Sequence, residues 1–250
     1  MNSVKILGLD FFNDQVEKLN SYLIRSGGLV VVPAAPALVE NVDNPLYYRS
    51  LEAADIVLPD SGYMCLCWNF LSRKKVKKLS GLLFLREFLN FLHVKKEFSK
   101  VVFIVPTLES ANSIKRTLEK LHNVDVVDNQ FYVLKTFRRK EKVYDEKLVR
   151  LIQESGFRHV IINVGGGIQE LLGAYIKSET SGARVSIVCT GAALLFMTGE
   201  QVRIPVWGDR IYMGWLFRIV SDPSKYFMRY FKALKLISLL RKFGSQNPDV

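Results

Sequence analysis

The sequence predicts an α/β protein with a Rossmann-like, mostly parallel sheet flanked by helices and a C-terminal helical appendage. Short runs rich in valine and isoleucine alternate with stretches of helical periodicity along most of the 250 residues. A hydrophobic content of 49% with 24% charged residues argues against disorder, and the length is enough to bury a substantial core. We expect the main α/β domain over residues 1–200 and the appendage over residues 201–250.

The expected strands are short apolar runs followed by turns or helical patterns. They lie at Val4–Leu9, Leu29–Val32, Ile56–Leu58, Val101–Val105, Val124–Val127, His159–Asn163 and Val185–Cys189. Helical periodicity falls between them, at Asp14–Ser26, Pro45–Ala54, Tyr63–Leu71, Leu82–His93, Ser110–Leu121, Asp145–Ser155 and Gln169–Lys177. The stretch Phe131–Lys147 has few apolar positions, so we expect an exposed crossing there. The alternation favours a doubly wound sheet and leaves the strand order open.

One apolar run leads directly into a carboxylate and a glycine turn, in the order Asp55-Ile-Val-Leu-Pro-Asp60-Ser61-Gly62. In an open parallel sheet, ligands collect outside the carboxyl ends of the strands, so Asp60 is a candidate catalytic residue. The alternative is that Asp60 or Ser61 caps the helix that follows, by accepting a hydrogen bond from a free backbone N–H.

Two further strand ends carry glycine and polar residues that could line the same crevice. The run ending at Val164 leads into Gly165, Gly166, Gly167, Gln169 and Glu170, and the run ending at Cys189 leads into Thr190 and Gly191. Backbone N–H groups of such turns can bind phosphate oxygens. We therefore expect the three strand ends to form one ligand site.

The later sequence adds Ile204-Pro-Val-Trp207, then Trp215-Leu-Phe-Arg218, then Asp222-Pro223. In this order the motifs resemble the WecG/TagA/CpsF family of bacterial glycosyltransferases. That family has a strand-end Leu-Pro-Asp-Gly element, a Gly-x-Pro-x-Gln-Glu element, a Gly-Gly turn and a Trp-x-x-Arg signature before a proline. The resemblance implies transfer of a hexose or N-acetylhexosamine from a UDP-sugar to a polyprenyl-diphosphate-linked sugar during exopolysaccharide synthesis for the cell envelope.

An inverting transfer needs a base for the acceptor hydroxyl and donors for the leaving diphosphate. We expect Asp60 to be the base, the turns at Gly165–Gly167 and Thr190–Gly191 to lie near the nucleotide, and Gln169 and Glu170 to hold sugar hydroxyls. Candidates for contact with the diphosphate or the membrane are Arg203, Arg210, Arg218, Arg229 and Lys232. The alternative for these arginines is an ordinary surface position.

Several other chemistries do not fit the sequence. No Gly-x-x-x-x-Gly-Lys-Ser/Thr loop occurs, and Glu170 takes the last position of what would otherwise be a Gly-x-Gly-x-x-Gly dinucleotide motif. The three histidines show no metal-ligand spacing, and no Asp-x-Asp pair is present to hold a divalent cation on a diphosphate. We therefore expect a reaction without metal or cofactor.

The formal net charge of +11 favours a phosphate-bearing partner such as a nucleotide sugar, a nucleic acid or anionic lipid. No nucleic-acid-binding module is recognisable, so we expect no nucleic-acid partner. The basic run Arg73–Lys78 is either a solvated turn or a phosphate contact. Cys65, Cys67 and Cys189 have no pairing pattern and are expected to be reduced thiols.

The end of the sequence predicts a basic amphipathic helix from Pro223 onward. Its apolar positions are Tyr226, Phe227, Tyr230, Phe231, Leu234, Ile237 and Leu240, and its basic positions are Lys225, Arg229, Lys232, Lys235, Arg241 and Lys242. Such a helix can lie in a membrane interface, or it can pack on the domain with a solvated basic face. The family resemblance favours the membrane, hence a cytoplasmic protein peripheral on the inner face of the plasma membrane. A homo-oligomer is left open.

The chain departs from the family pattern at several positions. Pro33–Ala37 stands where relatives carry a polar Thr-x-Asn-Pro-Glu run, and Pro106–Ser110 replaces a glycine-rich turn. An acidic residue is missing after Gly81, and Gly-Ile-Gln-Glu replaces Gly-x-Pro-x-Gln-Glu. These changes leave two interpretations, a changed substrate or a catalytically inactive scaffold or regulatory subunit of a polysaccharide assembly complex.

Overall fold

The computed structural model describes residues 1–135, 143–191, 193–198, 212 and 214–248. Within them, eight strands form one sheet in the order β1-β2-β4-β3-β8-β7-β5-β6. The strands are β1 (Ser3–Ile6), β2 (Leu9–Phe12), β3 (Gly28–Val31), β4 (Ile56–Val57), β5 (Val101–Val105), β6 (Phe131–Val133), β7 (His159–Ile162) and β8 (Ser186–Cys189). Every neighbouring pair is parallel except β1–β2, which confirms the α/β, Rossmann-like fold class.

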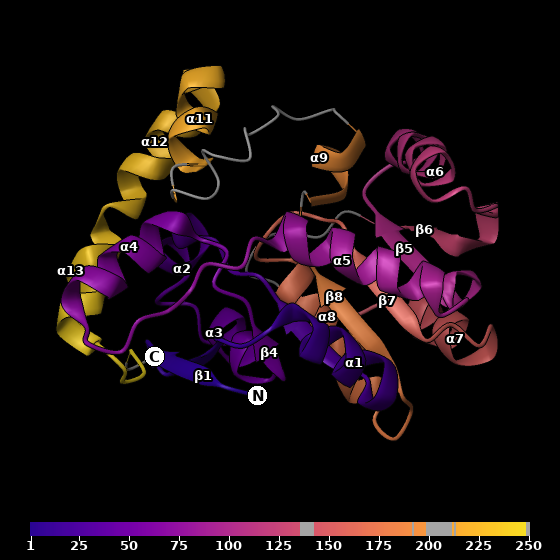
Figure 1. Ribbon diagram of the computed structural model, residues 1–250, viewed down its shortest axis with the longest axis horizontal. Helices are drawn as coiled ribbons and strands as arrows, with labels where there is room; N and C mark the ends of the chain where they lie inside the picture. Colours follow the sequence, from indigo (N-terminus) through magenta and orange to yellow (C-terminus); the bar gives the residue numbers. More distant parts are fainter. Residues whose placement is uncertain (136–142, 192, 199–211, 213, 249–250) are drawn as a thin grey trace.

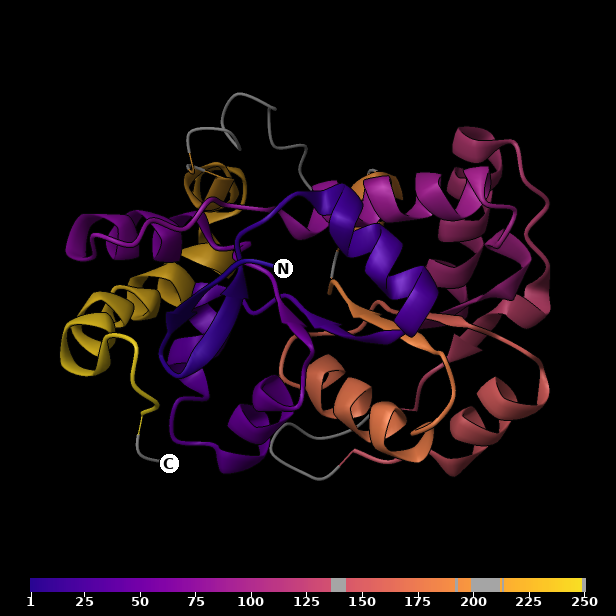
Figure 2. The ribbon, with the colours of Figure 1, turned by 60° about the horizontal axis from the view of Figure 1, so that its bottom comes forward.

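Helices cover both faces of the sheet, so the molecule has three layers (Figure 2). One face carries α1 (Val16–Ser26), α5 (Gly81–Val94), α6 (Leu108–His122) and α9 (Ala193–Thr198). The cluster on the other side includes α2 (Ala35–Glu40), α3 (Pro45–Glu52), α4 (Gly62–Leu71), α7 (Glu146–Glu154), α8 (Gln169–Glu179) and α13 (Lys235–Phe243). Two more helices, α11 (Gly214–Ser221) and α12 (Pro223–Ala233), precede α13 at one end of the molecule (Figure 1).

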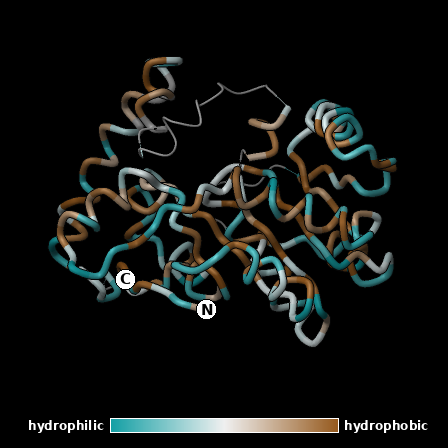
Figure 3. The backbone as a smooth tube through the Cα atoms, viewed as in Figure 1, coloured by the Kyte–Doolittle hydropathy of each residue, from teal (hydrophilic) through white to brown (hydrophobic). Residues whose placement is uncertain are grey.

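The strands are apolar on both sides because helices cover both faces. In β5, Val102 and Ile104 point into one hydrophobic cluster, whereas Phe103 and Val105 point into the other. All five residues of this strand are buried, and the centre of the molecule is correspondingly hydrophobic (Figure 3). A strand buried on both faces reads as a continuous apolar run, which is the pattern that the sequence shows.

The expected first strand Val4–Leu9 is correct only for Val4–Ile6, because a tight turn at Leu7 and Gly8 divides the run and a second strand begins at Leu9. Leu7 and Gly8 both have positive φ, at 49° and 78°, as a two-residue hairpin turn requires. The same turn binds the segment that follows α13. The N–H groups of Leu7 and Gly8 donate to the carbonyls of Gly244 and Ser245 at 2.8 and 3.2 Å.

The expected strand Val124–Val127 is also wrong. Only Val126 of that run is buried, and the edge strand is β6, inside the region that we expected to be an exposed crossing. The buried amide of Gln130 donates to the carbonyls of Phe98 and Val101 at 2.9 and 3.0 Å, and this fixes the chain where β6 begins. Part of the expected crossing, residues 136–142, lies outside the described residues.

The expected single C-terminal helix is two helices that meet at Leu234, and the two differ in how far their apolar side chains are buried. Leu236 and Leu240 of α13 are buried in the same cluster as α4, whereas Phe227 and Phe231 of α12 are exposed and stack on each other with ring centroids 6.2 Å apart. Packing on the domain therefore describes α13, whereas the exposed aromatic side chains lie on α12. The division into residues 1–200 and 201–250 as separate folding units remains a prediction.

His159 is a buried base at the start of β7. Its side chain is 3% exposed, its ring meets Phe88 edge-on, and its Nε2 lies 3.9 Å from Glu97 Oε2. Burial lowers the pKa of His159 to about 4, although Glu97 opposes the shift. In the unfolded chain the imidazole has its ordinary pKa near 6.5. The unfolded state therefore binds a proton that the folded state rejects between about pH 6.5 and pH 4.

We predict that this histidine makes the fold acid-sensitive. Because the folded-state pKa is the lower one, the free energy of unfolding should fall as the pH falls, by about 2 kcal/mol between pH 7 and pH 5 from His159 alone. His159→Gln, which does not titrate, should lose correspondingly less over the same range. Denaturant unfolding of both proteins at the two pH values measures the difference, and equal losses would contradict the assignment.

Candidate active site

Asp60 lies just beyond the carboxyl end of β4, between the first turns of two helices. Its Oδ1 accepts a hydrogen bond of 2.8 Å from the N–H of Gly81, the first residue of α5. Its Oδ2 accepts none within the described part of the chain. The cap of α4 is Ser61, whose Oγ accepts from Met64 N–H at 3.2 Å. Ser61 therefore caps α4, and Asp60 instead holds the first N–H of α5 through one oxygen.

Gly62 explains why a glycine follows this carboxylate. A Cβ built on Gly62 would overlap the backbone carbonyl of Tyr212. The Tyr212 hydroxyl in turn accepts from the N–H of Lys78 at 3.4 Å. Tyr212 thus lies directly against the turn that carries Asp60, and only a residue without a side chain permits this approach.

The glycine turn between β7 and α8 is open. A Cβ added at Gly165, Gly166 or Gly167 would meet no atom within 4 Å. The N–H of Gly167 is already used, because it donates to Glu170 Oε2 at 2.7 Å. Of the three expected phosphate-binding N–H groups, Gly165 and Gly166 donate no hydrogen bond among the described residues.

Gln169 and Glu170 join two turns of the site to each other. Glu170 Oε1 accepts from Gln169 Nε2 at 3.0 Å, and Gln169 Oε1 accepts from the N–H of Gly191 at 2.6 Å. Both side chains are buried, and burial raises the pKa of Glu170 against the opposing hydrogen bonds from Gln169 and Gly167. Their geometry therefore positions the turns after β7 and β8, while their contact with a sugar stays a prediction.

Asn163 is a site residue that the sequence analysis missed, because it was placed inside a strand. Its side chain is 2% exposed, and neither its Oδ1 nor its Nδ2 has a hydrogen-bond partner among the described residues. The same is true of the Oγ1 of Thr190. Ile162 pairs with Cys189, so the next residues, Asn163 and Thr190, lie side by side at the ends of adjacent parallel strands. Buried polar groups usually have a partner, so these atoms at a strand end are candidates for contact with a ligand, an ion or a water.

The structure brings most of the expected site residues to one edge of the sheet. Neighbouring strands lie about 4.8 Å apart, so the ends of β4, β3, β8 and β7 span about 15 Å along this edge. After β7 the chain crosses to α8 on one face, and after β8 it crosses to α9 on the other, the change of direction at which open α/β sheets bind ligands.

The expected basic residues of the appendage are only partly described. Arg203 and Arg210 lie outside the described residues. Arg218 belongs to α11 and Arg229 to α12, and their side chains are likewise outside the description. Lys232 is exposed on α12.

The sequence was also compared with known proteins. The model of the glycosyl transferase WecG/TagA/CpsF family matches residues 4–247. The chain belongs to this family. No curated protein matches it. As a member of the WecG/TagA/CpsF family it is a glycosyltransferase, and the family supports a role in making a cell-surface polysaccharide.

The described residues contain neither a candidate membrane-spanning helix nor a candidate metal-binding cluster. None of the helices there combines the length and the hydropathy that crossing a bilayer requires. No group of three or more His, Cys, Asp or Glu side chains in the same residues is arranged to hold a metal ion.

We predict that Gly62→Ala moves Tyr212 away from the turn that carries Asp60. Alanine would ordinarily stabilise a helix by up to about 1 kcal/mol relative to glycine, but here its methyl group would overlap the Tyr212 carbonyl. Glycosyl transfer should fall at least about tenfold, and hydrogen–deuterium exchange of the peptide that contains Tyr212 should rise. Ser61→Ala is the control, because it removes the helix cap without approaching Tyr212. Unchanged exchange and a more stable Gly62→Ala protein would show that the contact is absent in solution.

We predict that Asn163→Leu separates binding from stability. Leucine has the same branched outline with bulkier terminal groups and removes two unpartnered polar atoms, so the free energy of unfolding should change by no more than about 1 kcal/mol. If the amide contacts a nucleotide-sugar donor, the KM for the donor should rise at least about tenfold. Thr190→Val is the matched variant on β8. A wild-type KM in both proteins would remove these residues from the site.

Proposed function

We propose that this glycosyltransferase is an inverting, metal-independent enzyme that moves a hexose or N-acetylhexosamine from a UDP-sugar to a polyprenyl-diphosphate-linked sugar. The observation that carries the proposal is the placement of Asp60. It stands beyond the carboxyl end of β4, is not the cap of α4, and has one oxygen fixed on the N–H of Gly81 at the start of α5.

In this mechanism the acceptor hydroxyl attacks the anomeric carbon on the face opposite the nucleotide. A new C–O bond forms as the bond between the anomeric carbon and the diphosphate oxygen breaks, and the electron pair leaves with UDP. The hydroxyl proton passes to Asp60, whose Oδ1 is held by Gly81 while Oδ2 is left to receive it.

The leaving diphosphate needs positive partners along the same edge. The free N–H groups of Gly165 and Gly166 are the candidates from the core, and they lie in a turn with open space around it. Arg203, Arg210, Arg218 and Arg229 remain the proposed partners from the appendage, since the guanidinium group suits phosphate oxygens. The edge from β4 to β7 is long enough for a nucleotide sugar to lie along it, with its sugar toward Asp60.

A lipid-linked acceptor requires the enzyme to reach the membrane. Support comes from α12, where Phe227, Met228, Phe231 and the adjoining Leu234 are each about half exposed beside the exposed Lys232. Aromatic and aliphatic side chains next to a cation are typical of helices in a membrane interface. We therefore propose a peripheral location on the inner face of the plasma membrane.

A second candidate function is a catalytically inactive scaffold or regulatory subunit of a polysaccharide assembly complex. The segment Pro33–Ala37, which replaces a polar run of the family, favours it. Ala35, Pro36 and Ala37 are buried at the start of α2, against which α12 packs. This segment therefore offers side chains for packing and none for holding a sugar.

The test is transfer by purified protein and by Asp60→Asn. Asparagine keeps the oxygen that accepts from Gly81 but cannot take a proton, so turnover should fall by about 10² or more with little change in the free energy of unfolding. Ser61→Ala should do the reverse, losing about 1 kcal/mol of stability and keeping turnover. Release of UDP is measured with a panel of UDP-hexoses and UDP-N-acetylhexosamines and a lipid-linked acceptor extract, with and without excess chelator.

The outcomes separate the two candidates. Near-wild-type turnover by Asp60→Asn would exclude this residue as the base. UDP binding by the wild type without transfer of any sugar would favour the scaffold. Inhibition by chelator that magnesium or manganese reverses would contradict the metal-independent mechanism.

A further inference from the structure

The helix that begins beside Asp60 ends in an exposed apolar face. Met64, Cys65, Cys67 and Trp68 of α4 are buried and anchor the helix in the core. On its other side Leu66 is 42% exposed and Phe70 is 81% exposed, and their four-residue spacing places them on one face. Leu71 is also exposed. An exposed phenylalanine beside two leucines is an apolar patch without a partner in the described residues.

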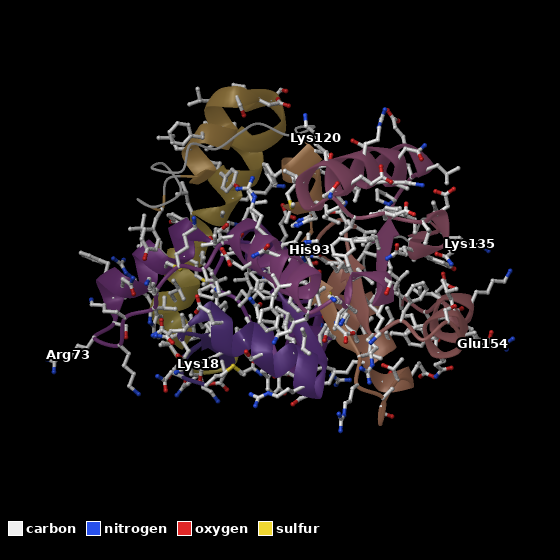
Figure 4. The ribbon with its side chains drawn as sticks, turned by 45° about the vertical axis from the view of Figure 1, so that its right-hand side comes forward. Lys18, Arg73, His93, Lys120, Lys135 and Glu154 are labelled. Atoms are coloured by element: carbon white, nitrogen blue, oxygen red, sulfur yellow. The ribbon has the colours of Figure 1, made fainter. Side chains whose placement is uncertain are left out.

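A run of cations follows this patch directly. Residues 61–86 contain six basic residues and no aspartate or glutamate. They are Arg73, Lys74, Lys75, Lys77, Lys78 and Arg86. Of these, Arg73, Lys74, Lys75 and Lys77 are exposed and pair with no described acid. Figure 4 shows Arg73 at the outer edge of the molecule with its side chain pointing away from the sheet.

The basic segment is rigidly held. Trp68 Nε1 donates to the carbonyl of Lys74 at 2.7 Å, and the Asn69 side chain bonds both backbone groups of Val76 at 2.8 and 2.9 Å. Asn13 makes the same two-sided contact further on, with the carbonyl of Lys75 at 3.2 Å and the N–H of Lys77 at 2.9 Å. The cations are therefore presented at fixed positions, which a loosely solvated turn would not require.

The same face continues onto the C-terminal helices. Tyr63, one turn before Leu66 on α4, donates from its hydroxyl to the carbonyl of Leu234 at 3.4 Å. Leu234 is half exposed and follows the exposed Phe227 and Phe231 of α12. Figure 1 shows α4 beside α12 and α13 at one end of the molecule. Apolar side chains of α4 and α12 thus flank one junction.

We propose that the end of α4 and the basic segment 72–77 form a second membrane-docking surface, which binds a bilayer containing anionic lipid. Phe70 and Leu66 enter the headgroup boundary, and Arg73, Lys74 and Lys77 bind lipid phosphates. The charge favours a membrane over a protein partner, because an apolar patch followed along the chain by four exposed cations matches the acyl–headgroup boundary of an anionic leaflet.

This surface also explains how Asp60 could reach the sugar of a lipid-linked acceptor at the membrane. In this respect the inference rests on the proposed function. Helix α4 has 10 residues and is about 15 Å long. Asp60 precedes its N-terminus and Phe70 lies at its other end. When Phe70 is in the interface, a rigid helix holds Asp60 at a fixed height above it, where the sugar of a lipid-linked diphosphate projects.

The experiment compares matched pairs of substitutions by co-sedimentation with phosphatidylcholine vesicles, with and without phosphatidylglycerol. Phe70→Ser with Arg73→Glu should lower partitioning onto anionic vesicles at least about tenfold. The control on α6 is Leu121→Ser with Lys120→Glu, which also replaces one exposed apolar side chain and one exposed cation. It should bind like the wild type. Phe231→Ser with Lys232→Glu tests α12 separately. Thermal unfolding confirms that each variant folds.

Transfer assays separate this proposal from the proposed function. The α4 variant should transfer sugar normally to a short-chain, water-soluble acceptor and at least about tenfold more slowly to a long-chain acceptor in vesicles. Vesicle binding equal to that of the wild type would overturn the second surface, even if transfer is intact. Wild-type vesicle binding together with a loss of self-association in the α4 variant would assign the patch to a second copy instead. No transfer to either acceptor by the wild type would overturn the proposed function alone.

Discussion

The geometry of the candidate site depends on one buried carboxylate, Glu170. Burying this group is costly, and its two oxygens are compensated by Gly167 N–H and Gln169 Nε2. Gln169 is thereby oriented to accept from Gly191 N–H, so the turn after β7 and the turn after β8 are linked through two side chains. The N–H groups of Gly167 and Gly191 are consumed by this link, and Gly165 and Gly166 are left facing open space.

The C-terminal segment is at once part of the core and part of the site. Leu236 and Leu240 of α13 belong to the main hydrophobic cluster, and Gly244 and Ser245 bond the β1–β2 turn. Tyr212, earlier in the same segment, crosses over Gly62. The preceding α12 packs against α2 of the core, and α13 packs against α4, the helix that begins just after Asp60.

The sequence predicted the layered fold well, because strands buried on both faces leave continuous apolar runs. It also placed Asp60 correctly at a strand end, although only the hydrogen bonds show that Ser61 caps α4 and that Asp60 binds the start of α5. The hairpin at Leu7–Gly8 was missed because a leucine with positive φ carries no turn signal. Asn163 was missed for a related reason, since an asparagine at the end of a strand becomes unusual only when its environment shows no partner.

The same unpartnered residues bear on whether the substitutions at Pro33–Ala37 signal lost activity. That segment follows β3, and its buried alanines lie at the start of α2, against which α12 packs. Strand β8 lies next to β3 and β7 next to β8, and at their ends stand Thr190 and Asn163 with unused hydrogen-bonding atoms. Retaining three such atoms in a core is unfavourable unless something binds them. The polar atoms at the ends of β8 and β7 are thus available to a ligand, whereas the packed segment after β3 is not.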